Sequence, residues 1–261
     1  MKSRQAYGAA IENVRRICAF VVTAAEESGL DARAVYHCEV SVDEICTNII
    51  EHGYTSRPAT DPGEIEIQTY FDGECLEITI TDSAPAFDPT THEETLIGTD
   101  VMQKEPGGWG IAFVKKLMDS IQYEYSQGKN HLFLTKCVSA LPAGSLETSG
   151  FAIWVTPPSG KIRTIKIQGR LDNTTAPGLS ETLQEQQAIG YKRLVADLSQ
   201  VTYISSSGLK VLASGWRSAS ESGREFVLAG ATPHVNEILD MVGFTTFFEI
   251  YTDADHALTG Q

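Results

Sequence analysis

Long apolar runs and paired cysteines are both missing from this sequence. No stretch approaches the roughly 18 uninterrupted apolar residues that a membrane-spanning helix needs, and Met1–Ala10 lacks the apolar core of a secretory signal. We therefore expect a cytoplasmic protein with no membrane association. The five cysteines form no Cys-x-x-Cys pair and no cluster with histidine at metal-binding spacing. Neither a disulfide framework nor a zinc site is predicted, and the thiols of Cys38 and Cys46 are expected to be buried and free.

Basic charge is also scarce. The chain carries 20 Lys and Arg against 34 Asp and Glu, a net charge of −14. Most of the excess lies in residues 1–140, which hold 11 basic and 22 acidic side chains. An acidic surface repels phosphate backbones, so nucleic-acid binding is disfavoured. A basic partner protein is compatible with this charge, although acidity alone selects no partner.

The first half of the chain predicts helices over a sheet. Apolar residues recur every three or four positions from Ala10 to Ala24, and again from Val35 to Ile49 behind a capping Asp31. Two strand-like segments, 64–71 and 75–82, then flank an Asp-Gly turn. An irregular stretch, a third helix and a second hairpin of strands 121–126 and 131–136, around a turn at 127–130, complete this part. This order predicts an α+β layer with helices over one antiparallel sheet.

The second half has a different pattern. Residues 138–150 are rich in small residues, Pro and Gly without periodicity, which predicts a linker. After it, strand-like and helical segments alternate, and this alternation predicts a small, partly parallel sheet covered by helices. The expected strands lie at 151–155, 162–168, 193–197, 225–228 and 247–251, and the expected helices near 176–189, 207–220 and 233–241. We therefore expect domains at 1–137 and 151–261.

Glu44 and Asn48 form the first candidate functional pair. Residues four apart on a helix lie about 40° from each other, so both side chains share one face. That face lies roughly 110° from the centre of the apolar stripe. A carboxylate there can orient or deprotonate an attacking hydroxyl, and an amide oxygen can ligate Mg²⁺ beside phosphates. Taken alone, the pair is better explained as two solvated residues on an ordinary helix.

Asp82 and a glycine-rich segment add two further signals. Asp82 ends a strand-like segment, where an acceptor-only carboxylate can take a hydrogen bond from an amino-bearing ring; a turn-initiating Asp is an equally ordinary explanation. Gly107-Gly108-Trp109-Gly110 precedes the third helix. Glycines allow close backbone approach to a ligand, and a helix N-terminus presents amides to phosphate. A flexible loop is the alternative.

The order and spacing of these three motifs resemble the three boxes of the GHKL ATPase fold. More narrowly, they resemble the anti-sigma-factor serine kinases of bacteria, over about residues 8–137. The resemblance implies an ATP- and Mg²⁺-binding kinase domain. The site residues it implies are a catalytic Glu44, a Mg²⁺ ligand Asn48, an adenine-recognising Asp82, and Gly108 and Gly110 closing over the phosphates.

Two features limit this resemblance. GHKL proteins usually carry glycines after the strand-end Asp, whereas this chain reads Asp82-Ser83-Ala84-Pro85-Ala86. Sensor histidine kinases share the fold, but residues 1–30 are too short for a dimerising phospho-acceptor helix and contain no histidine. A histidine kinase is therefore not expected.

The second candidate site is a run of serines, Ser205-Ser206-Ser207-Gly208, after a buried strand and a predicted turn. Serine is a preferred helix cap, which explains the run without further function. A phosphate at a helix N-terminus also meets free amides and the positive end of the dipole. The segment around it, with the Gly-Arg-Leu-Asp sequence at 169–172, resembles the STAS domain of anti-anti-sigma factors, over about residues 152–258. That resemblance implies phosphorylation at Ser206, although the family's preceding Asp is replaced by Ser205.

These resemblances predict a GHKL sandwich followed by a small α/β STAS domain in one chain. We expect an ATP-dependent protein serine kinase of a partner-switching pathway, which phosphorylates Ser206 or a separate STAS protein. The alternative is a catalytically weak or inactive nucleotide-dependent binding protein. The implied partners are a STAS-domain protein or a sigma factor, with a serine phosphatase left open, and the resemblance suggests a homodimer.

Overall fold

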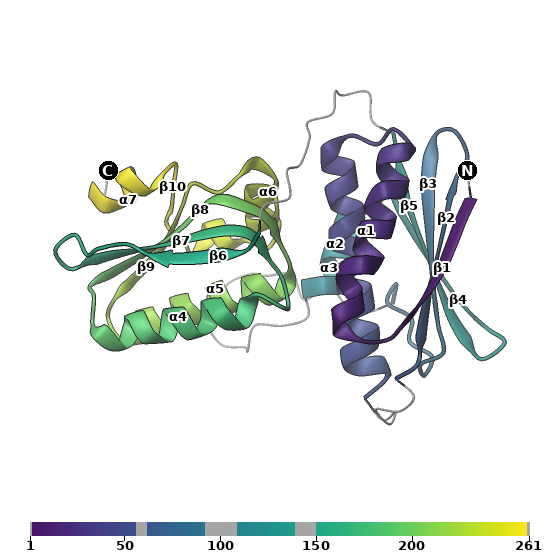
Figure 1. Cartoon of the computed structure of the whole chain (residues 1–261), viewed down its shortest axis with the longest axis horizontal. Coiled ribbons are helices and arrows are strands. Elements are labelled where there is room, and N and C mark those ends of the chain that lie inside the picture. Colours follow the sequence, from purple (N-terminus) through teal and green to yellow (C-terminus); the bar gives the residue numbers. More distant parts are fainter. Residues whose placement is uncertain (1, 56–61, 92–108, 139–149, 260–261) are drawn as a thin grey trace. The chain divides into compact units, whose positions relative to one another are not determined.

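The computed structural model describes residues 2–55, 62–91, 109–138 and 150–259 (Figure 1). The chain divides into two compact units, and each is described here by itself. The linker expected at 138–150 lies, but for its two end residues, outside the described residues. Within those described ranges, no helix combines the length and apolar character that crossing a membrane requires.

The first unit is a five-stranded antiparallel sheet with its helices on one face (Figure 1). Its strands, in the spatial order β1-β2-β3-β5-β4, are β1 (Lys2–Gly8), β2 (Glu64–Phe71), β3 (Cys75–Asp82), β4 (Ser120–Ser126) and β5 (Lys129–Cys137). Its helices are α1 (Ile11–Glu27), α2 (Ala32–Asn48) and α3 (Trp109–Leu117), and a π-helical turn, Ile49–Gly53, extends α2. The α+β prediction is confirmed.

The core of this unit explains why these segments fold as they do. The predicted apolar stripes of α1 and α2 are buried against alternate residues of the strands. Asp31 caps α2 as expected, since its carboxylate accepts a hydrogen bond from the N–H of Ala34 at 2.8 Å. Members of this core include Val14, Ile17, Val21, Val35, Val42, Ile65, Ile67, Ile78, Ile80 and Leu134.

Strand β1 was not predicted. Its residues are mostly polar and exposed, so no apolar alternation marks it. It is held at the sheet edge by an antiparallel register with β2 that runs from Lys2 opposite Tyr70 to Gly8 opposite Glu64. This strand is held by backbone pairing rather than by burial of its side chains. A single sequence contains no residue pattern that predicts such pairing.

A disulfide joins Cys75 to Cys137, so the expectation of no disulfide was wrong. The two residues are 62 positions apart and lie directly opposite each other on β3 and β5. Motif spacing could not reveal them, because the strand register brings them together. Cys18, Cys38 and Cys46 are buried and form no disulfide, as expected for Cys38 and Cys46. Burial raises the pKa of the Cys38 thiol to about 12.

The second unit contains a five-stranded sheet. The two strands that come first in the sequence pair antiparallel, and the other neighbouring strands pair parallel. Its strands, in the spatial order β10-β9-β8-β7-β6, are β6 (Ala152–Val155), β7 (Ile162–Leu171), β8 (Arg193–Ile204), β9 (Glu225–Ala229) and β10 (Ile250–Tyr251). The helices are α4 (Ala176–Ile189), α5 (Ser206–Glu221), α6 (Pro233–Met241) and α7 (Ala254–Thr259). Figure 1 shows α4 and α5 together on one face of this sheet. The predicted partly parallel α/β unit is confirmed.

Two local expectations in this unit were wrong. The turn predicted before Ser205 does not exist, because β8 continues to Ile204. Its register against β7 shifts twice, and the exposed Ser199 lies at the first shift. The last strand is only Ile250–Tyr251, because a 3₁₀ turn at Phe244–Thr246 precedes it.

Candidate nucleotide and phosphorylation sites

Glu44 and Gly110 lie against each other in the first unit. Glu44 sits in the last two turns of α2 and is only 4% exposed, so it is not the solvated residue of the simpler explanation. A Cβ atom on Gly110, in the first turn of α3, would overlap the Glu44 carboxylate. The glycine therefore has a steric role, since only a residue without a side chain lets α3 begin beside this carboxylate.

Asn48 is the last residue of α2, one helical turn beyond Glu44, and is half-buried. Its amide oxygen is a ligand type that Mg²⁺ accepts. Among the described residues, no three His, Cys, Asp or Glu side chains are grouped to hold a metal ion. A Mg²⁺ ion at this position would therefore be held by Asn48 together with nucleotide phosphates, the arrangement that Mg²⁺ commonly adopts. Gly107 and Gly108 lie outside the described residues.

Asp82 ends β3, as predicted, and is buried. Its Oδ1 atom accepts hydrogen bonds from the N–H of Ala84 at 2.7 Å and from Nδ2 of Asn130 at 2.9 Å. Within the described ranges, no group donates to Oδ2, which leaves that oxygen able to accept from an amino group. Burial raises the pKa of Asp82, and the two hydrogen bonds oppose this shift without cancelling it.

Asn130 organises the loop that follows Asp82. Besides its bond to Asp82, its Nδ2 donates to the carbonyl of Ala84 at 3.1 Å. Its Oδ1 accepts from the N–H of Phe87 at 3.2 Å and from the hydroxyl of Tyr123 at 2.7 Å. The sequence predicts Asn130 within a hairpin turn at 127–130. The turn is shorter, with positive φ at Gln127 and Gly128, so Asn130 belongs to β5 directly opposite Asp82.

The end of the α2 extension holds the other side of this loop. The hydroxyl of Tyr54 accepts from the N–H of Ser83 at 2.9 Å and donates to the carbonyl of Glu64 at 2.9 Å. A Cβ atom on Gly53 would lie 2.8 Å from the Ala84 methyl group. The loop that the GHKL family builds with glycines is thus fixed here by side chains from two neighbouring elements. No sequence motif indicates this contact, because Tyr54 and Ser83 are 29 positions apart.

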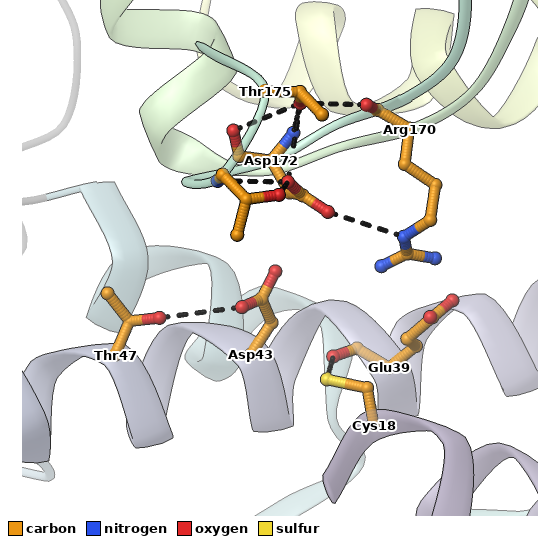
Figure 2. Close-up of polar contacts among 8 residues, drawn as sticks. Cys18, Glu39, Asp43, Thr47, Arg170, Asp172 and Thr175 are labelled. Atoms are coloured by element: carbon orange, nitrogen blue, oxygen red, sulfur yellow. Dashed lines mark hydrogen bonds and ion pairs between the residues drawn. The ribbon is translucent and has the colours of Figure 1, made fainter. Parts of the chain in front are cut away.

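Asp43 and Asp82 place acidic charge near the helix that carries Glu44. Asp43 is buried next to Glu44 and accepts a hydrogen bond from the Thr47 hydroxyl at 3.4 Å (Figure 2). Burial raises the pKa of the Cys46 thiol, and the charges of Asp43 and Asp82 raise it further. Asp82 therefore acts electrostatically on the helix that carries Glu44.

Ser206 opens α5 in the second unit and is 8% exposed. The residue before it, Ser205, is tied at both ends of its backbone. Its N–H donates to the carbonyl of Leu171 at 3.0 Å, and its own carbonyl accepts from the N–H of Leu209 at 3.0 Å. A Cβ atom on Gly208 would lie 2.7 Å from the same Leu171 carbonyl oxygen. The first turn of α5 is thus pressed against the end of β7.

The Gly-Arg-Leu-Asp segment forms a tightly bonded loop at that strand end. One oxygen of Asp172 accepts from both the N–H and the hydroxyl of Thr174, at 3.0 and 2.7 Å. The Thr175 hydroxyl donates to the carbonyl of Arg170 at 2.8 Å. The Arg170 guanidinium pairs with Asp172 at 3.5 Å (Figure 2). It also lies over the ring of Tyr203, 3.7 Å from the ring centre. The carboxyl ends of β7 and β8 therefore meet at the start of α5.

Family comparisons match both units. The family described as a histidine kinase-like ATPase domain matches residues 7–136. The STAS domain family matches residues 154–257.

Curated relatives match one part of the chain each. A putative anti-sigma factor antagonist, BtrV of Bordetella bronchiseptica, is 32% identical over 35% of this chain and 78% of its own length. The serine/threonine-protein kinase BtrW of the same organism is 27% identical over 40% of this chain and 71% of its own. The serine-protein kinase RsbW of Bacillus pumilus is 29% identical, with shares of 39% and 68%.

Proposed function

The chain belongs to the histidine kinase-like ATPase and STAS families, which it joins in one polypeptide, and from this premise we propose that it is an ATP-dependent protein serine kinase of a partner-switching pathway. The acceptor is a serine of a STAS unit, and Ser206 is the acceptor that this chain itself carries. Relatives named as kinases and as an antagonist support the two halves of this proposal.

One observation carries the proposal: a buried carboxylate, Glu44, held directly against Gly110 in the first turn of α3. A carboxylate in such a place can accept a hydrogen bond from a seryl hydroxyl and take its proton as the phosphoryl group is transferred. The start of α3 offers backbone amides to the phosphates of ATP. Phosphoryl transfer needs mostly alignment and charge stabilisation, so a rigid carboxylate beside a phosphate-binding helix start is a suitable arrangement.

The remaining residues bind and orient the nucleotide in this proposal. Asp82 accepts from the adenine amino group through Oδ2, while Asn130 and Tyr54 hold the loop beneath the base. Asn48 ligates Mg²⁺. The metal, when bound, supplies positive charge that neutralises the transferred phosphoryl group. The proposed partners are a separate STAS protein or a sigma factor, the proposed assembly is a homodimer, and the proposed location is the cytoplasm.

A second function is favoured by the burial of Ser206 and by the glycine-poor loop after Asp82. With its acceptor serine shielded, the chain would act as a nucleotide-dependent binding protein with little chemistry. Both functions require ATP binding, so only transfer of the phosphoryl group distinguishes them.

The test uses full-length protein, Mg²⁺ and ATP labelled at the γ-phosphate. We expect label on the wild type, none on Ser206→Ala, and none on Glu44→Gln, which should still bind ATP. Glu51→Gln is the matched control, because Glu51 follows in the π-helical turn and is exposed; it should label as the wild type does. Full labelling of Glu44→Gln would contradict the catalytic role of Glu44.

Mixing the two inactive variants identifies the route of transfer. Glu44→Gln keeps an intact acceptor and Ser206→Ala keeps an intact kinase site. Label on Glu44→Gln in the mixture would mean transfer between molecules, whereas an unlabelled mixture beside a labelled wild type would mean transfer within one. If the wild type binds ATP yet labels neither itself nor an added STAS protein, the binding function is correct.

A further inference from the structure

The hydroxyl of Ser205 is buried without a hydrogen-bond partner. Ser205 is only 4% exposed, and its Oγ atom bonds to none of the residues that the structure describes. It occupies the N-cap position of α5, where a serine side chain ordinarily accepts from an N–H of the first turn. No such cap bond is present. A buried hydroxyl left unpaired is costly, so its retention calls for a partner that arrives under other conditions.

The backbone around this hydroxyl is fixed. Ser205 is bonded to Leu171 on one side and Leu209 on the other, and Gly208 packs against the Leu171 carbonyl. Only rotation about the side-chain bond of Ser205 remains to aim its O–H. The donor is therefore preorganised at the start of a helix of 16 residues, next to Ser206.

The ligand that fits this place is an anion with several acceptor oxygens. The first turn of α5 directs N–H groups and the positive end of the helix dipole outward. A phosphoryl group on Ser206 would bring three acceptor oxygens and a charge of about −2 to this position. We propose that Ser205 is a phosphate-binding residue, whose hydroxyl donates a hydrogen bond to the phosphoryl group of phosphorylated Ser206 at the N-terminus of α5. This inference rests on the proposed function, because it takes Ser206 as the acceptor.

The replacement of the motif's Asp by Ser205 then changes how this position interacts with a phosphate. An Asp before the acceptor serine, as the resemblance implies for relatives, offers only acceptors and repels a phosphate. Ser205 offers a donor instead. The nearby charges of Arg170 and Asp172 are engaged with each other and with Thr174. In this chain the phosphoryl group is held on the STAS unit itself, so less of its charge is presented to a partner.

The test measures the second ionisation of phosphoserine by ³¹P NMR. Phosphoserine is inserted at position 206 of the full-length chain during translation, so the measurement does not depend on kinase activity. The pKa of this group should lie at least ~0.5 unit below its value in the same protein unfolded in urea, because hydrogen bonds to the dianion favour ionisation. Failure of the proposed kinase reaction would leave this result intact, and the reverse also holds.

Variants at position 205 separate the hydroxyl from the helix N-terminus. Ser205→Ala should move the pKa back toward the unfolded value, Ser205→Thr should preserve the shift, and Ser205→Asp should raise the pKa above that of Ser205→Ala. Ser222→Ala, at the exposed C-cap of the same helix, is the control and should leave the pKa unchanged. The inference is overturned if the protein with Ser205 and the Ser205→Ala variant share one pKa, because a raised pKa in Ser205→Asp alone would follow from charge repulsion. Should Ser205→Ala not fold, Ser205→Val takes its place, since it is nearly isosteric with Ser205→Thr but has no hydroxyl.

Discussion

At the scale of single residues, Asn130 connects three parts of the candidate adenine loop. It donates to the Asp82 carboxylate and accepts from Phe87 and Tyr123, so β3, the following loop and β4 meet at one amide. In GHKL proteins with glycines after the strand-end Asp, the loop conformation follows from backbone freedom. Here Ser83 and Ala84 stand in that loop, and a side-chain amide supplies the constraint. Asn130 is thus a positioning residue for Asp82.

We expect Asn130→Ala to weaken ATP binding by about tenfold or more, because it frees the Asp82 carboxylate and the loop that holds it. Leaving buried polar partners unpaired should also lower the free energy of unfolding by roughly 1–3 kcal/mol. Calorimetric titration with ATP and chemical denaturation measure the two effects. Lys129→Ala, at the exposed first position of the same strand, is the control and should change neither. ATP affinity equal to that of the wild type would show that Asn130 does not position Asp82.

The raised pKa of Asp82 makes the stability of the fold and the affinity for ATP change with pH in opposite directions. Because the folded-state pKa exceeds the unfolded value, the fold prefers the protonated carboxyl, and ionised Asp82 destabilises the protein at neutral pH. Acidification through the folded-state pKa therefore removes this destabilisation. The same protonation removes the anion that accepts from adenine, so ATP affinity should fall over that pH range.

Titration of ATP binding from pH 7 down to pH 4.5 checks this prediction. Affinity of the wild type should begin to fall above the ordinary range of aspartate, whose unperturbed pKa is about 3.9. Asp82→Asn should bind ATP more weakly at pH 7 and show a flatter profile. An identical pH profile for the two proteins would mean that Asp82 does not control nucleotide affinity.

At the scale of elements, the strands β3 and β5 carry both the candidate adenine residues and the disulfide. Asp82 and Asn130 face each other at one end of this pair, and Cys75 and Cys137 are bonded at the other. The N–H of Cys137 also donates to the carboxylate of Asp119. The ammonium group of Lys136 donates both to Asp119 and to the carbonyl of Leu117 at the end of α3. The disulfide end of the pair is thereby linked to the helix whose start lies against Glu44.

Reduction of this disulfide should destabilise the first unit. The bridge closes a loop of about 62 residues, for which the loss of chain entropy in the unfolded state corresponds to an upper estimate of about 4 kcal/mol. A lower midpoint of thermal unfolding in dithiothreitol is the expected result. Cys75→Ser/Cys137→Ser should show the lower midpoint without reductant and no further change with it. Cys18→Ser is the matched control, since Cys18 is not part of the disulfide; it should keep the response to reductant.

Elements with strong side-chain periodicity could be predicted from the sequence, and elements made by pairing could not. The stripes of α1 and α2 and the alternation of β2 and β3 gave correct bounds to within a few residues, because burial determines both the pattern and the element. Strand β1 and the bulges of β8 depend on which backbone lies alongside them. Of the candidate site, the motifs predicted Glu44 and Asp82 as nucleotide residues. The hydrogen bonds of Asn130 and Tyr54 join residues distant in sequence, so no motif could indicate them.

At the scale of the whole molecule, each of the two units has its own buried core. The candidate nucleotide residues and the disulfide belong to the first unit, and Ser205 and Ser206 to the second. A ligand that binds one folded unit stabilises that unit alone, by about 2.7 kcal/mol at a concentration one hundred times its dissociation constant. If ATP binds the first unit, it should therefore stabilise only that unit against unfolding.

Differential scanning calorimetry should resolve two transitions in the full-length chain. ATP with Mg²⁺ should raise the midpoint of one of them, and reduction of the disulfide should lower the midpoint of that same transition. Leu212→Ala, which removes a fully buried side chain of α5, should lower the other transition by an amount corresponding to about 2–5 kcal/mol. If ATP instead raises the transition that Leu212→Ala lowers, the nucleotide binds elsewhere than at Glu44, Asn48 and Asp82. The assignment of the kinase site to the first unit would then be wrong, whatever the chain transfers.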